Sequence, residues 1–127
     1  MDAKKRKTSI TRIYKKTLED MKSLGTFRPE FDAPVRRYAE LRIQYEILTD
    51  KWYEDECKVT EEYTNKAGAT NQRKTSLYLA METLRKELTD MENLFGLTPK
   101  GLKGIKTKGL EAAKGSRLDA ALAQLDD

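Results

Sequence analysis

Residues 77–99 read LYLAMETLRKELTDMENLFGLTP, and this stretch holds the clearest helical pattern in the chain. Its apolar residues recur at alternating intervals of four and three positions, the spacing of a coiled-coil seam: Leu77, Met81, Leu84, Leu88, Met91 and Phe95. Gly96 is a natural helix stop, and Leu97 follows where an apolar residue packs back on the last turn. The pattern therefore predicts a long helix over about 74–95.

A second long helix is predicted upstream, over about 33–56. Asp32 is expected to cap it, and Pro34 is tolerated in a first helical turn. One set of apolar residues has the spacing of a coiled-coil seam: Tyr38, Leu41, Tyr45, Leu48 and Trp52. A second set forms another apolar face of the same helix: Ala39, Ile43 and Ile47. A helix with two apolar faces contacts two neighbours.

A shorter helix is predicted over about 9–24, capped by Thr8 or Ser9 and ended by Gly25. Between the long helices, residues 57–75 lose the helical period, and a small hairpin and a loop are equally compatible with them. After Pro99, glycines interrupt a lysine-rich stretch, so residues 100–115 are expected to be mobile. A short helix after Ser116 is expected to fold only against a partner.

These elements predict a mainly α protein, an antiparallel helical hairpin or small bundle that assembles into an oligomer. We expect a basic N-terminal arm and first helix (1–24), a helical oligomerisation core (25–99) and a basic tail with a short helix (100–127). The long helices offer more apolar surface than one hairpin buries. Six residues are predicted at contacts between subunits: Tyr38, Ile43, Tyr45, Ile47, Trp52 and Leu94.

The net charge of +4 is unevenly distributed, because both ends of the chain are basic and the middle is not. Clustered cations attract phosphates by counterion release. Neither end interleaves aromatic residues, which favours contact with the DNA backbone over base stacking. Solvated tails are the alternative interpretation. The candidate DNA-binding residues are Lys4, Lys5, Arg6, Lys7, Arg12, Lys15, Lys16, Lys100, Lys103, Lys106 and Lys108.

The composition disfavours an enzyme. With no histidine and one cysteine, the chain lacks the residues of a Cys/His zinc site or a Ser/His/Asp triad. No phosphate-binding loop or dinucleotide motif is present, so we predict no catalytic residue, metal or cofactor. Residues 54–56 are interpreted as a solvated acidic helix end and Cys57 as a structural residue. Neither a membrane span nor a signal peptide is predicted, and we expect a cytoplasmic protein.

The segment from Leu77 to Pro99, closing on Phe95-Gly96-Leu97-Thr98-Pro99, resembles the phage terminase small subunits. In that family a long helix ends on the same string. The resemblance covers roughly residues 27–102. Two details differ: Asn71-Gln72 stands where the family often has Asn-Pro, and residues 100–102 replace small residues and an arginine.

The resemblance implies a ring-forming protein that engages viral double-stranded DNA and recruits or regulates the large subunit, which holds the ATPase and nuclease activities. An oligomer larger than a dimer is therefore expected. The candidate contacts to a protein partner are Leu118, Leu122 and Leu125. Two alternatives remain: a small helical DNA-binding regulator, and a coiled-coil adaptor without DNA binding.

Overall fold

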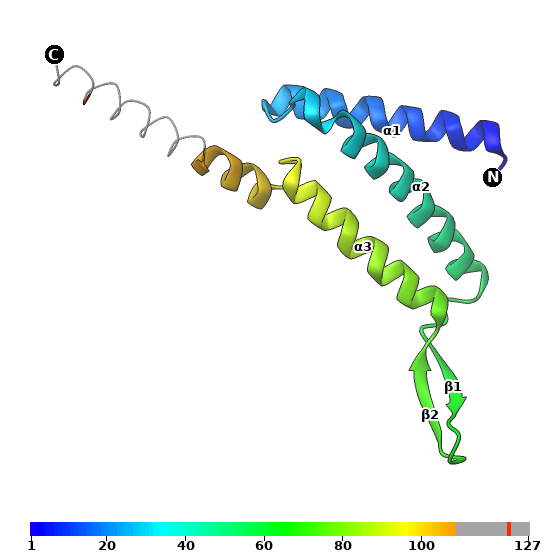
Figure 1. Ribbon diagram of the computed structural model, residues 1–127. Helices are drawn as coiled ribbons and strands as arrows, with labels where there is room; N and C mark the ends of the chain where they lie inside the picture. Colours follow the sequence, from blue (N-terminus) through cyan, green and yellow to red (C-terminus); the bar gives the residue numbers. More distant parts are fainter. Residues whose placement is uncertain (109–121, 123–127) are drawn as a thin grey trace.

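Three long helices and one β-hairpin form the main part of the fold (Figure 1), as described by a computed structural model for residues 1–108 and Leu122. The elements in chain order are α1 (Ala3–Leu24), a 3-10 turn (Pro29–Phe31), α2 (Asp32–Glu54), β1 (Thr60–Thr64), β2 (Thr70–Lys74) and α3 (Ser76–Leu94). Residues 99–108 are also helical. The mainly helical fold is confirmed, and of the two possibilities for residues 57–75 the structure has the hairpin.

Helix α2 lies between α1 and α3 and packs against both, as its two apolar faces predict (Figure 1). The core gathers at the end where all three helices meet. There the ring of Phe95 packs edge-on against Phe31 and Tyr38, with ring centres 5.8 and 5.7 Å apart. Met21 from α1 and Val35 from α2 are fully buried beside them. These contacts fix the direction of α1 relative to the other two helices.

Both predicted glycine stops are confirmed. Gly25 and Gly96 adopt left-handed backbone with φ of 76° and 73°. After each glycine the chain folds back, so that the Thr26 amide donates to the Met21 carbonyl and the Leu97 amide to the Glu92 carbonyl, both at 2.9 Å. This pattern satisfies carbonyls that the helix itself leaves free.

Helix α1 begins earlier than predicted, at Ala3, because Asp2 caps it and neither Thr8 nor Ser9 does. The Asp2 carboxylate accepts a hydrogen bond from the Lys5 amide at 2.8 Å. A carboxylate at this position stabilises the helix N-terminus. The basic residues expected in an arm therefore lie on a helix.

The predicted capping role of Asp32 is wrong. Its side chain makes no hydrogen bond to the first turn of α2; instead the Tyr14 hydroxyl donates to its carboxylate. The guanidinium of Arg36 stacks over the Tyr14 ring at 4.2 Å. Asp32 thus links α1 to α2, a tertiary role that no local pattern indicates.

The helix over 99–108 contradicts the expected loss of structure after Pro99 in this part of the tail. The Thr98 hydroxyl accepts from the Gly101 amide at 3.0 Å and so caps the helix. Gly101 also lies so close to Asn93 that any side chain there would collide with the Asn93 backbone. The glycine is required by this close packing, which outweighs its poor helix propensity.

Within residues 1–108 and Leu122, no helix combines the length and the apolar character needed to cross a bilayer.

Candidate nucleic-acid interface

The outward side of α1 is a row of cations. On a helix, positions three, four and seven apart share a face. The apolar residues Ile10, Ile13 and Tyr14 turn toward α2 and are at least half-buried, while the residues opposite them are exposed. The exposed side holds Lys4, Lys5, Arg12, Lys15, Lys16 and Lys22. We call these six residues the α1 basic face.

Arg6 and Lys7 belong to a different side of α1. Together with Ile10 they line a shallow hollow against α2, where Glu40 and Ile43 form the opposite wall. Glu40 is the one acid among the residues that line this hollow. Five of the seven predicted N-terminal residues therefore lie on the α1 basic face, and these two lie beside it.

Two acids of α1, Glu19 and Asp20, lie among the cations of the α1 basic face. Asp20 holds Lys16 in an exposed ion pair with Nζ and Oδ1 2.9 Å apart. The hydrogen bond from Lys16 to Asp20 and the carboxylate charge raise the pKa of Lys16. Exposed pairs of this kind are weak and screened by salt, so Asp20 holds Lys16 only weakly.

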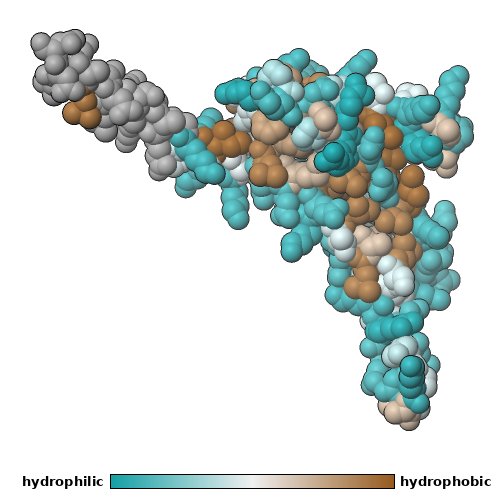
Figure 2. All heavy atoms as spheres, viewed as in Figure 1, coloured by the Kyte–Doolittle hydropathy of each residue, from teal (hydrophilic) through white to brown (hydrophobic). Residues whose placement is uncertain are grey.

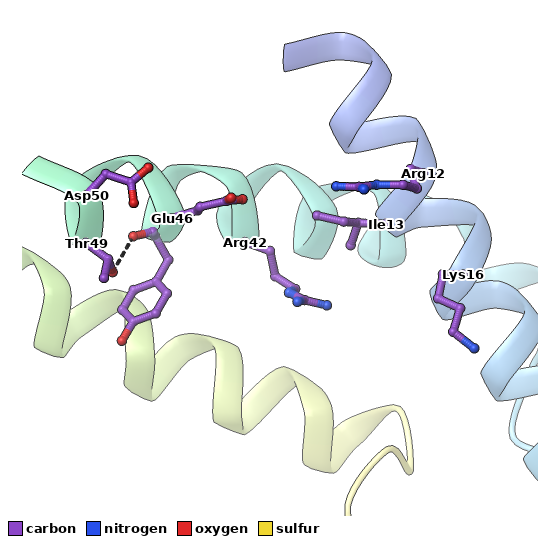
Figure 3. A pocket seen from close by; sticks show the side chains of 8 residues that line it. Arg12, Ile13, Lys16, Arg42, Glu46, Thr49 and Asp50 are labelled. Atoms are coloured by element: carbon purple, nitrogen blue, oxygen red, sulfur yellow. Dashed lines mark hydrogen bonds between the residues drawn. The ribbon is translucent and has the colours of Figure 1, made fainter. Parts of the chain in front are cut away.

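A hollow of about 560 Å³ opens between α1 and α2 beside this face (Figure 3). Arg12 and Lys16 line it from α1 and Arg42 lines it from α2. Glu46 and Asp50, further along α2, line the same hollow, so its charge is mixed. Arg42 also borders the neighbouring hollows between α2 and α3 and next to the end of α1. It forms no ion pair with any residue among 1–108.

Arg42 was missed by sequence reasoning, although a signal was present. It stands between Ala39 and Ile43, two buried residues on the side of α2 that faces α1. A polar residue at the border of a buried face lies next to the neighbouring helix. Arg42 extends the cationic surface of Arg12 and Lys16 onto α2.

The guanidinium of Arg42 lies over the Tyr38 ring, 5.9 Å from its centre. The Tyr38 hydroxyl donates to the Glu92 carboxylate at 2.9 Å. Burial, reinforced by this hydrogen bond, raises the pKa of Tyr38 to about 12. The side chain therefore stays neutral at physiological pH and acts as a fixed donor that joins α2 to α3.

The second predicted basic segment lies on the helix over 99–108. Lys100, Lys103 and Lys106 follow each other at intervals of three, while Ile105 turns back toward the core near Gly96. These lysines and Lys108 are exposed. They form a second, shorter cationic surface.

The two basic segments are not brought together within one chain. Thr26, just after α1, lies against Gly96 near the 99–108 helix. Helix α1 has 22 residues, a length of about 33 Å, and it runs away from that point (Figure 1). Lys4 and Lys5 consequently lie at the far end of the molecule from Lys100.

The residues predicted at subunit contacts fall into three groups. Tyr38 and Ile43 are 2% and 1% exposed, so they fill the protomer's own core and offer almost no surface to a second copy. Tyr45 and Trp52 are half-buried. Ile47 and Leu94 are 40% and 68% exposed.

The remaining predictions concern Cys57, the candidate partner contacts and a metal site. Cys57, predicted to be structural, is exposed and has a φ of 59° in the link after α2. Of the candidate partner contacts, Leu122 is helical and 59% exposed. Leu118 and Leu125 lie outside the described residues. Among the described residues, no group of three or more acids or cysteines is placed to hold a metal ion.

Comparison with known proteins identifies the family. A family model described as phage terminase, small subunit, matches residues 11–111, which include most of α1 and all of α2, the hairpin and α3. No curated protein and no solved structure gives a significant match. The matched region covers most of the chain and contains the Phe95–Pro99 string. The chain therefore belongs to the phage terminase small-subunit family.

Proposed function

We propose that this chain is a ring-forming small subunit that binds double-stranded DNA and recruits or regulates the large terminase subunit, without catalysing a reaction itself. Family membership supports a role in phage DNA packaging. The α1 basic face is the observation that carries the DNA-binding part of the proposal, because its cations repeat along a helix long enough to follow a duplex.

The α1 basic face favours contact with phosphates over reading of bases. Its side chains are lysines and one arginine, and the only tyrosine of α1, Tyr14, is turned inward toward Asp32. Bases are read by aromatic stacking or by planar groups placed in a groove. Exposed lysines supply charge without such geometry, so binding should depend little on sequence.

The heptad seam of α3 supports self-association. One row of the seam, Met81, Leu88 and Phe95, is 2%, 8% and 2% exposed and fills the core. The other row, Leu77, Leu84 and Met91, is only half-buried. Figure 2 shows an apolar band along the α2–α3 pair. We assign this band to contacts between subunits, which close into a ring when the rotation permits.

Two variants test this assignment. Leu84→Glu places a charge in the half-buried row, whereas Leu79→Glu places the same charge at a 47% exposed position on another side of α3. We expect sedimentation velocity to show a closed oligomer for the parent and for Leu79→Glu, and smaller species for Leu84→Glu. Circular dichroism of each variant reports whether the helices are retained. A parent that sediments as a monomer at micromolar concentration contradicts the ring.

The alternatives predict other outcomes. A helical regulator would form a dimer and bind one duplex sequence far more tightly than others. A coiled-coil adaptor would show no salt-dependent affinity for DNA.

For the large subunit, we assign recruitment to the C-terminal leucines that include Leu122. Deletion of residues 118–127 should abolish binding to the large subunit and leave DNA binding intact.

A further inference from the structure

The β-hairpin stands apart from the rest of the molecule. Figure 1 shows β1 and β2 projecting beyond the ends of α2 and α3. Every strand residue except Glu61 is exposed. A two-stranded hairpin with no face against a core is marginally stable in water. We therefore expect the hairpin to be stabilised by a partner in the assembled protein.

Both edges of the hairpin have unpaired backbone groups. The Thr75 amide donates to the Val59 carbonyl and the Asn65 amide to the Ala69 carbonyl, both at 3.0 Å. With the register that pairs Glu62 with Gln72, these bonds place the odd-numbered residues in the hydrogen-bonded pairs. The amide and carbonyl groups that point outward belong to Thr60, Glu62 and Thr64 on β1 and to Thr70, Gln72 and Lys74 on β2.

The two edges carry opposite charges. Strand β1 contains Glu61 and Glu62 and no base, while β2 contains Arg73 and Lys74 and no acid. Glu61 already pairs with Arg73 at 3.0 Å inside the hairpin. Glu62 forms no ion pair within residues 1–108. Two β1 edges or two β2 edges would repel each other, whereas a β1 edge and a β2 edge attract.

The direction of the hairpin is fixed by the helices. The Trp52 indole donates to the Lys58 carbonyl at 2.9 Å at the start of the link to β1. At the other end, Thr75 caps α3 and Lys74 pairs with Glu82 at 2.9 Å. In a cyclic assembly all hairpins consequently project the same way. A β2 strand then runs antiparallel to the β1 strand of the next subunit.

We propose that β2 of one subunit pairs with β1 of the next subunit, so that the hairpins join into a continuous antiparallel sheet around the ring. This inference rests on the proposed ring. The occupant of each hairpin edge is a second copy of this chain, selected by charge sign and strand direction. The polar, charged edges disfavour pairing with unrelated strands.

Disulfide trapping tests this pairing in the full chain. In a Cys57→Ser background, Glu62→Cys chains are co-expressed with chains that carry one cysteine on the same face of β2, at Thr70, Gln72 or Lys74. Adjacent strands lie about 4.8 Å apart. We expect mild oxidation to link unlike chains strongly at one of these three positions, which also reports the register. The control pairs Glu62→Cys with Asn71→Cys, whose side chain lies on the opposite face, and should link at least tenfold less.

The same samples are examined by native mass spectrometry, which separates this inference from the ring itself. A closed oligomer with no link between unlike chains overturns the strand pairing and leaves the ring intact. Links within assemblies that hold only Glu62→Cys chains would indicate β1–β1 pairing and also overturn it. A monomer overturns both. Amide exchange supplies a second readout: exchange at Glu62 and Gln72 should slow at least tenfold in the oligomer relative to Leu84→Glu, and equal exchange contradicts the pairing.

Discussion

Neutralising the α1 basic face should weaken DNA binding in a measurable, salt-dependent way. The variant replaces Lys4, Lys5, Arg12 and Lys15 with glutamine, all at exposed positions of α1. Glutamine is a good helix former, and the Asp2 cap uses the Lys5 backbone, so α1 should be retained. The change thus removes charge without removing structure.

The magnitude follows from counterion release. Each phosphate neutralised contributes a slope of about −0.9 to a plot of log affinity against log salt, so four lost contacts flatten the slope by about 3.6 for each subunit on the duplex. Between about 50 and about 200 mM salt, the parent should then lose about 150-fold more affinity than the variant for each subunit on the duplex. Fluorescence anisotropy with two duplexes of unrelated sequence measures both slopes.

A matched control separates local contact from net charge. Glutamine at Lys51, Lys58, Lys66 and Lys86 removes the same charge from exposed positions outside α1. We expect this control to keep the parental slope on both duplexes. If the two variants flatten the slope equally, or the α1 variant loses affinity for one sequence only, the assignment of DNA contact to the α1 basic face is refuted.

Four further predictions concern the stability of the helical framework. Gly96→Ala should destabilise the fold by about 1–3 kcal/mol in chemical denaturation, since φ is positive and the added methyl would meet a neighbour at 2.7 Å. Gly104→Ala, helical and with open space around it, should instead stabilise by about 0.5–1 kcal/mol. Asp2→Ala should lower the stability of α1 by about 1 kcal/mol. Hydrogen exchange should then show faster exchange of the amides in the first turn of α1, and unchanged exchange would contradict the capping role of Asp2. The pKa of Tyr38 lies at about 12 in the fold against an ordinary value of 10.0, so its contribution to stability is complete below pH 10 and is lost as pH rises toward 12. Tyr38→Phe should flatten the pH dependence of the melting temperature in that window, and an unchanged dependence would show that another group governs it.

The sequence predicted those features that depend on neighbouring residues. Helices α2 and α3 and the glycine stops after α1 and α3 were predicted because apolar spacing and left-handed backbone preference are local properties. The start of α1 was missed because a run of lysines resembles a solvated arm. The single Asp2 carboxylate is enough to cap the helix ahead of that run.

Tertiary contacts account for the rest. Asp32 has the sequence signature of a cap, yet Tyr14 from another helix uses its carboxylate. The 99–108 helix was missed because the low helix propensity of glycine argued against it. At Gly101 the close approach of the Asn93 backbone requires a glycine, and a local propensity does not reveal this contact. Arg42 was missed because its position between α1 and α3 depends on how the helices pack.

Native mass spectrometry of the full chain, with and without duplex DNA, tests the central claim most directly. A ring-forming, DNA-binding small subunit should give one closed oligomer larger than a dimer, and this species should gain the mass of a duplex when DNA is added at low salt. The duplex should be lost again as salt rises. A chain that remains a monomer or a dimer, or a closed oligomer that takes up no duplex at low salt, would contradict the account.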